Sequence, residues 1–278
     1  MTDSILYVVA TPIGNLSDMV PRAVEVLQTV SIIAAEDTRH SGKLLAHYNI
    51  TTPMISYHDH SDEQRLEQIM RHLHEGKSVA LISDAGTPLI SDPGYRLVTD
   101  VRKAGYAVIP IPGPCAAVAA LSAAGLPTDR FVFEGFLPAK SAARQKRLEL
   151  LQHEERTLVF YESTHRIVET LEDMAQVFGV DRQAVIAREL TKTFETIISA
   201  PLQELQAILN NDAHQCKGEF VVLLKGVDER DKHALDPDAE RILKILLEEL
   251  SVKQASELAA KITGVSKKAF YQFALNLK

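Results

Sequence analysis

The chain has 278 residues, 46% of them hydrophobic, 24% charged and 6% aromatic, and its formal net charge at pH 7 is -7. This composition is typical of a globular protein and excludes the disordered and fibrous classes. At about 100–200 residues per domain, the length predicts roughly two compact domains, each with its own core. The negative net charge argues against indiscriminate binding to polyanions.

Cysteine usage and the lack of a signal-like N-terminal pattern predict a protein of the reducing cytoplasm. Cys115 and Cys216 lie far apart and form no Cys-x-x-Cys motif. Residues 104–128 carry no Asp, Glu, Lys or Arg, but four prolines interrupt them, so we expect no membrane-spanning helix. We interpret His58-Asp59-His60 and His72-Leu73-His74 as surface histidines and expect no metal site.

The first part of the chain alternates short β-branched runs with amphipathic helical segments. The predicted strands are residues 5–10, 32–35, 79–83 and 107–111, and each is followed by a helical stretch. Such alternation favours an α/β domain with a largely parallel sheet. We place this domain at residues 1–126, because Gly125-Leu126-Pro127 interrupts the pattern.

The pattern restarts in a second α/β domain, which we place at residues 127–227. Its predicted strands are residues 131–136, 157–161 and 184–187, and its predicted helices are residues 142–155 and 165–178. Two further β-rich runs, 193–199 and 219–225, flank a single helix at 203–209. This arrangement predicts a mixed sheet with antiparallel strands.

The last segment, residues 228–278, begins with an acidic linker and continues as three predicted helices. Residues 228–240 hold six acids around Pro237, which is typical of a linker. In the turn before the last helix, Gly264 can close one helix in a left-handed conformation and Ser266 can cap the next. The short turn resembles that of a helix-turn-helix module. A purely structural three-helix cap is the alternative.

Two local basic patches stand out on the acidic chain. Residues 138–147 contain four cations and no acid, and residues 251–278 contain five lysines and one acid. Such patches suit selective contact with a phosphate backbone, and solvated helix faces are the alternative interpretation. We assign candidate contacts with such a phosphate backbone to Arg39, Lys140, Arg144, Lys146, Arg147, Lys267 and Lys268.

Three turns rich in glycine, proline and other small residues follow predicted strands: Thr11-Pro12-Ile13-Gly14-Asn15, Ser83-Asp84-Ala85-Gly86-Thr87-Pro88, and residues 112–117. Ligands in open α/β sheets bind at the carboxyl ends of the strands. One such turn alone would be an ordinary tight turn, but three at equivalent positions predict a ligand crevice. No G-x-G-x-x-G or P-loop motif occurs, so the sequence argues against classical dinucleotide binding and against Walker-type nucleotide hydrolysis.

These turns resemble those of the tetrapyrrole methylase family, which comprises S-adenosylmethionine-dependent enzymes. Residues 9–16, 35–39, 83–93, 161–166 and 187–192 resemble the branch that 2'-O-methylates a cytidine ribose in the decoding centre of bacterial 16S ribosomal RNA. The resemblance covers essentially the whole chain. It implies two α/β domains of tetrapyrrole methylase type, a cofactor cleft between them, a small C-terminal helical domain that is helix-turn-helix-like, and a homodimer.

The resemblance implies S-adenosyl-L-methionine as cofactor and 16S rRNA, packaged in the small ribosomal subunit, as partner. Residues 11–15 replace the glycine-rich, acid-ended turn of the tetrapyrrole-modifying members, which favours the RNA branch. A small-molecule methylase and a non-catalytic RNA-binding protein are the alternatives. The expected cofactor-binding residues lie at strand ends: Pro12, Gly14, Asp84, Ala85, Gly86, Thr87, Pro88, Ala116, Tyr161, Ala187 and Glu189.

Methyl transfer to a ribose hydroxyl requires removal of a proton, for which a nearby carboxylate is suited. We select Glu36 and Asp37, which follow the second predicted strand, as candidate catalytic residues. Asp84, Glu162 and Glu189 are further candidates. Each acid also has a structural interpretation, such as an ion pair of Asp37 with Arg39 or of Glu162 with Arg166.

Overall fold

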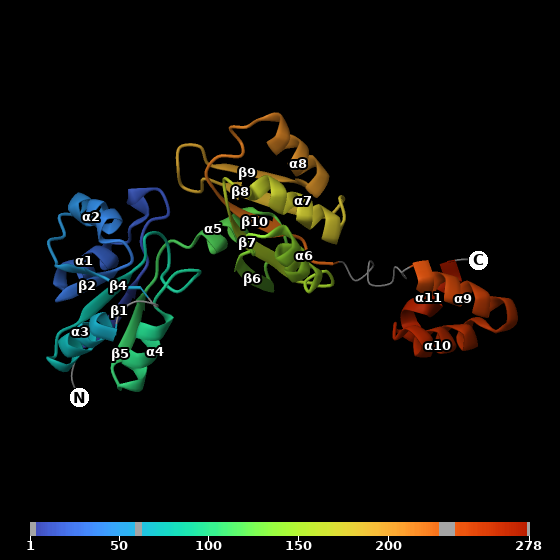
Figure 1. The fold of residues 1–278 in the computed structure, drawn as a ribbon, viewed down its shortest axis with the longest axis horizontal. Helices are drawn as coiled ribbons and strands as arrows, with labels where there is room; N and C mark the ends of the chain where they lie inside the picture. The colour runs from blue at the N-terminus through green and yellow to red at the C-terminus, as the bar shows by residue number, and fades with distance from the viewer. Residues whose placement is uncertain (1–3, 59–62, 228–236, 277–278) are drawn as a thin grey trace.

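The computed structural model describes residues 4–58, 63–227 and 237–276. Figure 1 shows two adjacent α/β domains and a separate group of three helices at the C-terminal end. Most of the expected acidic linker, residues 228–236, lies outside the described residues. Within the described residues, no helix has the length and apolar character needed to cross a membrane.

The first domain is a five-stranded parallel sheet covered by helices on both faces, as the alternating pattern predicts. Its strands are β1 (Ile5–Val9), β2 (Ile32–Ala35), β3 (Met54–Ser56), β4 (Val79–Ile82) and β5 (Ala107–Ile111), in the order β3-β2-β4-β1-β5. Its helices are η1 (Leu16–Asp18), α1 (Pro21–Thr29), α2 (Thr38–His47), α3 (Glu63–His74) and α4 (Tyr95–Lys103).

Each face of this sheet has its own core. Leu27 of α1 and Leu45 of α2 belong to the cluster on one face, whereas Leu73 of α3 and Leu97 of α4 belong to the cluster on the other. The prediction omitted β3, because a strand of three half-buried residues is too short to show a two-residue period.

The second domain contains the predicted mixed sheet. Its strands are β6 (Phe131–Phe136), β7 (Thr157–Ser163), β8 (Gln183–Arg188), β9 (Thr196–Pro201) and β10 (Glu219–Leu224), in the order β6-β7-β10-β8-β9. Only β6 and β7 are parallel, and the other neighbouring pairs are antiparallel. One face is covered by α6 (Ser141–Glu149), α7 (Ile167–Phe178) and α8 (Leu202–Asn211).

The helix α5 (Ala116–Ala123) covers the opposite face of this second sheet. Its Ala117, Ala120 and Leu121 are buried in one cluster with Val159 and Val221. Small side chains allow the helix to approach the strands closely. Because α5 packs on the second sheet, it belongs to the second domain, and the domain boundary lies before it. We expected the boundary after α5, at residues 126–127.

The C-terminal segment forms the three expected helices: α9 (Pro237–Glu249), α10 (Val252–Thr263) and α11 (Lys267–Asn276). They share a core that includes Leu243, Ala259 and Phe270. Gly264 closes α10 with φ 77°, in the left-handed conformation. The Ser266 hydroxyl accepts a hydrogen bond from the Ala269 N–H at 3.2 Å. The turn chemistry inferred from the sequence is confirmed at both positions.

Candidate functional site

The three small-residue turns meet at one edge of the first sheet, because β4, β1 and β5 are neighbouring strands. Thr11 and Gly86 exchange backbone hydrogen bonds of 2.8 and 3.0 Å between the first turn and the second. The Thr87 hydroxyl donates to the Pro114 carbonyl at 2.9 Å and joins the second turn to the third. The expected crevice edge therefore exists as a connected unit.

Gly86 is required at this junction by both conformation and space. Its φ is 84°, a region that side-chain-bearing residues rarely adopt. A Cβ atom built on Gly86 would lie 3.3 Å from Ile13 Cγ2 and 3.8 Å from the Pro114 carbonyl oxygen. A β-branched side chain at this position would strain the turn and fill space beside the crevice.

After the second turn, residues 89–94 fold back toward the second domain. Leu89 and Ser91 have φ values of 72° and 65°, which are uncommon outside glycine and typical of constrained functional loops. The loop reaches Gly135 in β6, where a Cβ atom would lie only 2.8 Å from Ser91 Oγ. The approach of Ser91 to Gly135 is one contact between the domains around the site.

The second contact between the domains involves the turn after β1 and the turn after β8. The Asn15 N–H donates to the Thr191 hydroxyl at 3.1 Å. A Cβ atom on Gly14 would overlap the Lys192 side chain. Gly14 therefore permits a close approach between domains, a role that differs from direct cofactor contact.

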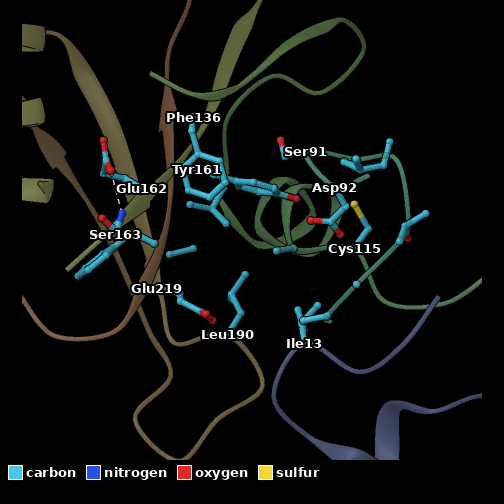
Figure 2. A pocket seen from close by; sticks show the side chains of 18 residues that line it. Ile13, Ser91, Asp92, Cys115, Phe136, Tyr161, Glu162, Ser163, Leu190 and Glu219 are labelled. Atoms are coloured by element: carbon cyan, nitrogen blue, oxygen red, sulfur yellow. Dashed lines mark hydrogen bonds between the residues drawn. The ribbon is translucent and has the colours of Figure 1, made fainter. Parts of the chain in front are cut away.

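A cavity of about 300 Å³ lies between the two domains and is flanked by these contacts. This volume falls within the range of small-molecule sites. Figure 2 shows Ile13, Cys115 and Asp92 on the side of the first domain, facing Tyr161 and Phe136 on the other. Six of the expected cofactor-binding residues line the cavity: Ala85, Gly86, Thr87, Ala116, Tyr161 and Ala187. The other five do not line it: Pro12, Gly14, Asp84, Pro88 and Glu189.

Tyr161 joins β7 to the start of α5. Its hydroxyl accepts a hydrogen bond from the Ala117 N–H at 3.1 Å. The ring makes edge contacts with Phe133 and Phe136, at centroid distances of 4.9 and 5.6 Å. Burial raises the pKa of Tyr161, so its hydroxyl stays protonated at neutral pH.

The two acids selected as catalytic candidates, Glu36 and Asp37, do not line the cavity. Asp37 caps α2, accepting from the Arg39 N–H at 2.8 Å, and forms an ion pair with the Arg39 guanidinium at 2.9 Å. The hydrogen bond from the Arg39 side chain lowers the pKa of Asp37 to about 2. A carboxylate with so low a proton affinity is a poor base.

Glu36 lies behind the cavity wall, where its carboxylate accepts a 3.5 Å hydrogen bond from the Asp84 N–H. Burial is the main cause that raises the pKa of Glu36. Asp84 in turn accepts from the Asp37 N–H at 3.0 Å. These two hydrogen bonds connect the ends of β2 and β4, so the side chains of Glu36 and Asp84 support the cavity wall.

Two other acids singled out in the sequence are engaged with neighbouring groups. Glu162 accepts hydrogen bonds from the Ser163 N–H, the Arg166 guanidinium and the Thr170 hydroxyl, at 2.8, 3.1 and 2.7 Å. Glu189 forms an ion pair with Lys192 at 2.8 Å. The predicted Glu162–Arg166 pair is confirmed.

Asp92 lines the cavity and was missed in the sequence analysis. Burial raises the pKa of Asp92 to about 6. A hydrogen bond from Ser83 opposes this increase, and the nearby carboxylates of Glu36 and Asp84 add to it. The Asp92-Pro93-Gly94 run before α4 is the signal available in the sequence, but it is also an ordinary turn pattern.

The expected RNA-contact residues occupy several different environments. Our interpretation of Arg144 is wrong, because its side chain is 1% exposed and its Nε lies 2.5 Å from Asp173 Oδ2 on α7. Arg147 forms an ion pair with Glu134 at 2.6 Å, and Lys267 forms one with Glu257 at 2.6 Å. The remaining four side chains are exposed to solvent: Arg39, Lys140, Lys146 and Lys268.

The cavity suits a small ligand with an apolar body and a positive charge. Ile13, Leu190 and Val221 provide apolar surface, while Asp92 provides a carboxylate. Among the described residues, neither lysine nor arginine lines the cavity. A cationic group would therefore meet an acid without a competing cation.

Comparisons with known proteins identify the fold and its relatives. The model of the family described as Tetrapyrrole (Corrin/Porphyrin) Methylases matches residues 5–206, and that of the RsmI C-terminal HTH domain matches residues 233–278. The chain is 54% identical to Ribosomal RNA small subunit methyltransferase I of Escherichia coli O157:H7, over 97% of this chain and 94% of the relative. It is also 54% identical to the protein of that name from Pseudomonas aeruginosa, over 99% and 98%.

Solved structures with low sequence identity share the fold. The cobalamin biosynthetic enzyme cobalt precorrin-4 methyltransferase, CbiF, superposes with a TM-score of 0.59 at 15% identity, covering 80% of this chain and 94% of its own. The methyltransferase CobJ gives 0.59 at 18% identity, covering 81% and 95%. The family model matches more than half of the chain, and the relatives are above 50% identity over nearly their full length. The chain therefore belongs to the tetrapyrrole methylase family.

Proposed function

We propose that this protein is an S-adenosylmethionine-dependent methyltransferase that modifies the ribosomal RNA of the small subunit. The observation that carries the proposal is 54% identity over nearly the full chain to proteins named Ribosomal RNA small subunit methyltransferase I. The match to the RsmI C-terminal HTH domain extends this similarity to the last helices. The interdomain cavity provides a place for a small methyl donor.

The specific reaction proposed is 2'-O-methylation of a cytidine ribose in the decoding centre of 16S rRNA. The motifs that resemble this branch of the family lie on both sides of the cavity, at residues 11–15 and 161–166. The alternative, a methylase of acidic tetrapyrroles, is less well supported, because no lysine or arginine in the described part of the chain lines the cavity to pair with a polycarboxylate. The intact turns disfavour a non-catalytic RNA-binding protein.

The residues of the cavity fit S-adenosylmethionine. Ala85, Gly86 and Thr87 would present backbone and small side chains to it, and Ala187 and Tyr161 would contact it from the second domain. When bound, the cofactor supplies an activated methyl group on a positively charged sulfur. The protein must therefore mainly bring the two reactants together in line and accept the proton of the hydroxyl.

Two features of the chain would orient the reactants and exclude water. The contacts Asn15–Thr191 and Ser91–Gly135 hold the domains together around the cavity. Phe136, which is 55% exposed, lines the cavity with its ring against Tyr161. A nucleotide drawn out of its RNA helix would meet an aromatic surface here, as is common for unstacked bases.

The exposed cations would contact the RNA backbone. Arg39 extends from the N-terminus of α2, next to the edge of the sheet that forms the site, and its side chain is 90% exposed. Lys140 and Lys146 are exposed near α6, and Lys268 is exposed on α11. Such contacts supply affinity that decreases as the salt concentration rises.

The proposed function is tested by incubating the protein with S-adenosylmethionine labelled on the methyl group and small ribosomal subunits that lack the modification. Free 16S rRNA serves as the parallel substrate. The RNA is then digested to nucleosides, and the label is expected to co-elute with 2'-O-methylcytidine. Label on a base, or no label on RNA from either substrate, would reject the proposal.

We also propose that the protein is a cytoplasmic homodimer, as its family resemblance implies. The chain mass is 30.7 kDa, so a dimer would sediment with roughly twice that mass. Sedimentation equilibrium at micromolar concentration tests this expectation. A single species at 30.7 kDa would contradict it.

A further inference from the structure

Three aromatic side chains line the cavity within the described ranges: Phe136, Tyr161 and Phe220. They differ in how much of the ring a ligand can reach. Phe220 is only 2% exposed, and Tyr161 is half-buried with its hydroxyl engaged by the Ala117 N–H. Phe136 is 55% exposed. Of the three rings, Phe136 is therefore the one that a group arriving from solvent can meet.

A β-bulge in β6 directs Phe136 toward the cavity. In a regular strand, residues three positions apart, such as Phe133 and Phe136, point to opposite faces of the sheet. The register between β6 and β7 shifts between Phe133 and Gly135, and Gly135 has a left-handed φ of 65°. As a result, both phenylalanine rings contact the ring of Tyr161. Bulges often redirect a side chain beside a functional site, and this one presents Phe136 there.

The ring of Phe136 is supported on one side and is not covered by its neighbour. It meets the Tyr161 ring at an interplanar angle of 64°, so the two rings do not stack face to face. A planar group can therefore stack on Phe136 from the solvent side. Unstacked nucleobases bind to aromatic side chains in this way. The small-residue turns proposed for the cofactor come from the opposite wall, in the first domain.

Two arginines hold the chain that follows this ring, residues 136–140, which we call the rim segment. Arg166 Nη2 donates to the Leu137 carbonyl at 2.6 Å, and Arg144 Nη1 donates to the Ala139 carbonyl at 3.3 Å. The backbone of the rim segment is thus fixed from the protein side at two positions. A segment that is already ordered pays less entropy when it binds a partner.

The rim segment ends at a cation, Lys140. Its side chain is exposed, and over the described ranges no acid forms an ion pair with it. Four residues of chain span at most about 14 Å. Lys140 can therefore bind a phosphate of the nucleotide that stacks on Phe136, or of a neighbouring nucleotide. Aromatic rings combined with cations are typical of surfaces that bind single-stranded nucleic acid.

We propose that the rim segment binds the target nucleotide of the RNA, an inference that rests on the proposed function. The base of the nucleotide to be methylated is drawn out of its helix and stacks on Phe136, and Lys140 pairs with an adjacent phosphate. Because Phe136 lines the cavity, a base stacked on it brings its own ribose toward the methyl donor. The rim segment forms and breaks no covalent bond, and it contributes by fixing where the ribose lies.

The test measures kcat/KM for small ribosomal subunits with variants of β6. Phe136→Ala should lower it at least about fivefold, which corresponds to about 1 kcal/mol, the lower end for a base stacked on an aromatic ring. Phe136→Tyr keeps such a ring and should stay within about twofold of wild type. Phe131→Ala removes an exposed ring at the other end of β6, outside the cavity, and is the matched control with wild-type kcat/KM. Calorimetry should show S-adenosylmethionine affinity of Phe136→Ala within about threefold of wild type.

Salt dependence separates the base contact from the phosphate contact. Lys140→Gln should reduce the log–log salt slope of subunit binding by about 0.7–0.9, because one phosphate contact is lost. Phe136→Ala should weaken subunit binding with an unchanged slope, because stacking releases no counterions. The two variants of one five-residue segment therefore have different expected signatures.

Several outcomes would overturn the inference and leave the proposed function intact. They are wild-type kcat/KM for Phe136→Ala, equal losses for Phe136→Ala and Phe136→Tyr, and a loss of cofactor affinity that accounts for the lower activity. An unchanged salt slope for Lys140→Gln would overturn it as well. A wild-type protein that methylates no ribosomal RNA would overturn both the inference and the proposed function.

Discussion

The basic run at residues 138–147 provides a prediction in which two cations of one helix have opposite roles. Arg144 and Lys146 both lie on α6, but Arg144 is buried and Lys146 is exposed. We expect Arg144→Met to destabilise the packing of α6 on α7 without removing an RNA contact. We expect Lys146→Ala to weaken RNA binding without a loss of stability.

The magnitude for Arg144 follows from its partners. Its Nε lies 2.5 Å from Asp173, and its Nη1 donates to the Ala139 carbonyl at 3.3 Å. Burial opposes ionisation of Asp173, but hydrogen bonds from Gln145, Arg144 and Ser141 together keep its pKa below the ordinary value. Breaking a buried pair by removing one partner costs about 3–5 kcal/mol. Because Ser141 and Gln145 remain as donors, at 2.9 and 2.7 Å, we expect the lower end, about 3 kcal/mol.

Hydrogen exchange of the intact protein measures this effect locally. A loss of about 3 kcal/mol corresponds to amide exchange in α7 that is at least about 100-fold faster at pH 7, where Asp173 is ionised. The double variant Arg144→Met with Asp173→Leu should recover most of the loss, because no unpaired charge stays buried. For Lys146→Ala, exchange should be unchanged and the log–log salt slope of RNA binding should decrease by about 0.7–0.9. An Arg144→Met protein with wild-type exchange and a reduced salt slope would refute this reasoning.

Three further predictions concern the cofactor, pH and the C-terminal helices. Gly86→Val should lower S-adenosylmethionine affinity at least about tenfold in calorimetry, because φ is 84° and a Cβ would crowd Ile13; unchanged affinity would contradict this site. Because its pKa is raised, Asp92 contributes stability at low pH that is lost as the pH rises through about 6. After discounting for solvent screening, Asp92→Asn should be more stable than wild type by about 1–2 kcal/mol at pH 8 and equally stable at pH 4. Equal urea midpoints of the two proteins at pH 8 would argue against the burial of this charge. Lys268→Gln should reduce the salt slope of RNA binding by about 0.7–0.9 with unchanged cofactor affinity; the same slope as wild type would indicate that α11 is part of a purely structural cap.

Much of the fold could be predicted from local patterns. The alternation of β-branched runs and amphipathic segments identified four of the five strands in the first domain and the mixed character of the second sheet. Turn chemistry was equally informative, because the left-handed conformation of Gly264 and the cap at Ser266 depend on residues close in sequence. The parallel topology then placed the turns at residues 11–15, 83–88 and 112–117 along one edge.

The identity of the charged groups at the site depended on contacts between distant segments. Arg144 and Lys146 look alike in the sequence, and only the packing of α6 on α7 buries Arg144 against Asp173. Asp92 reaches the cavity because Leu89 and Ser91 adopt left-handed conformations that their side chains do not favour. The loop packs its Ser91 against Gly135 of the other domain. Local sequence therefore determined the strands and turns. Tertiary packing decided which acids line the cavity and which cations face solvent, because burial and charge pairing arise only when the segments meet.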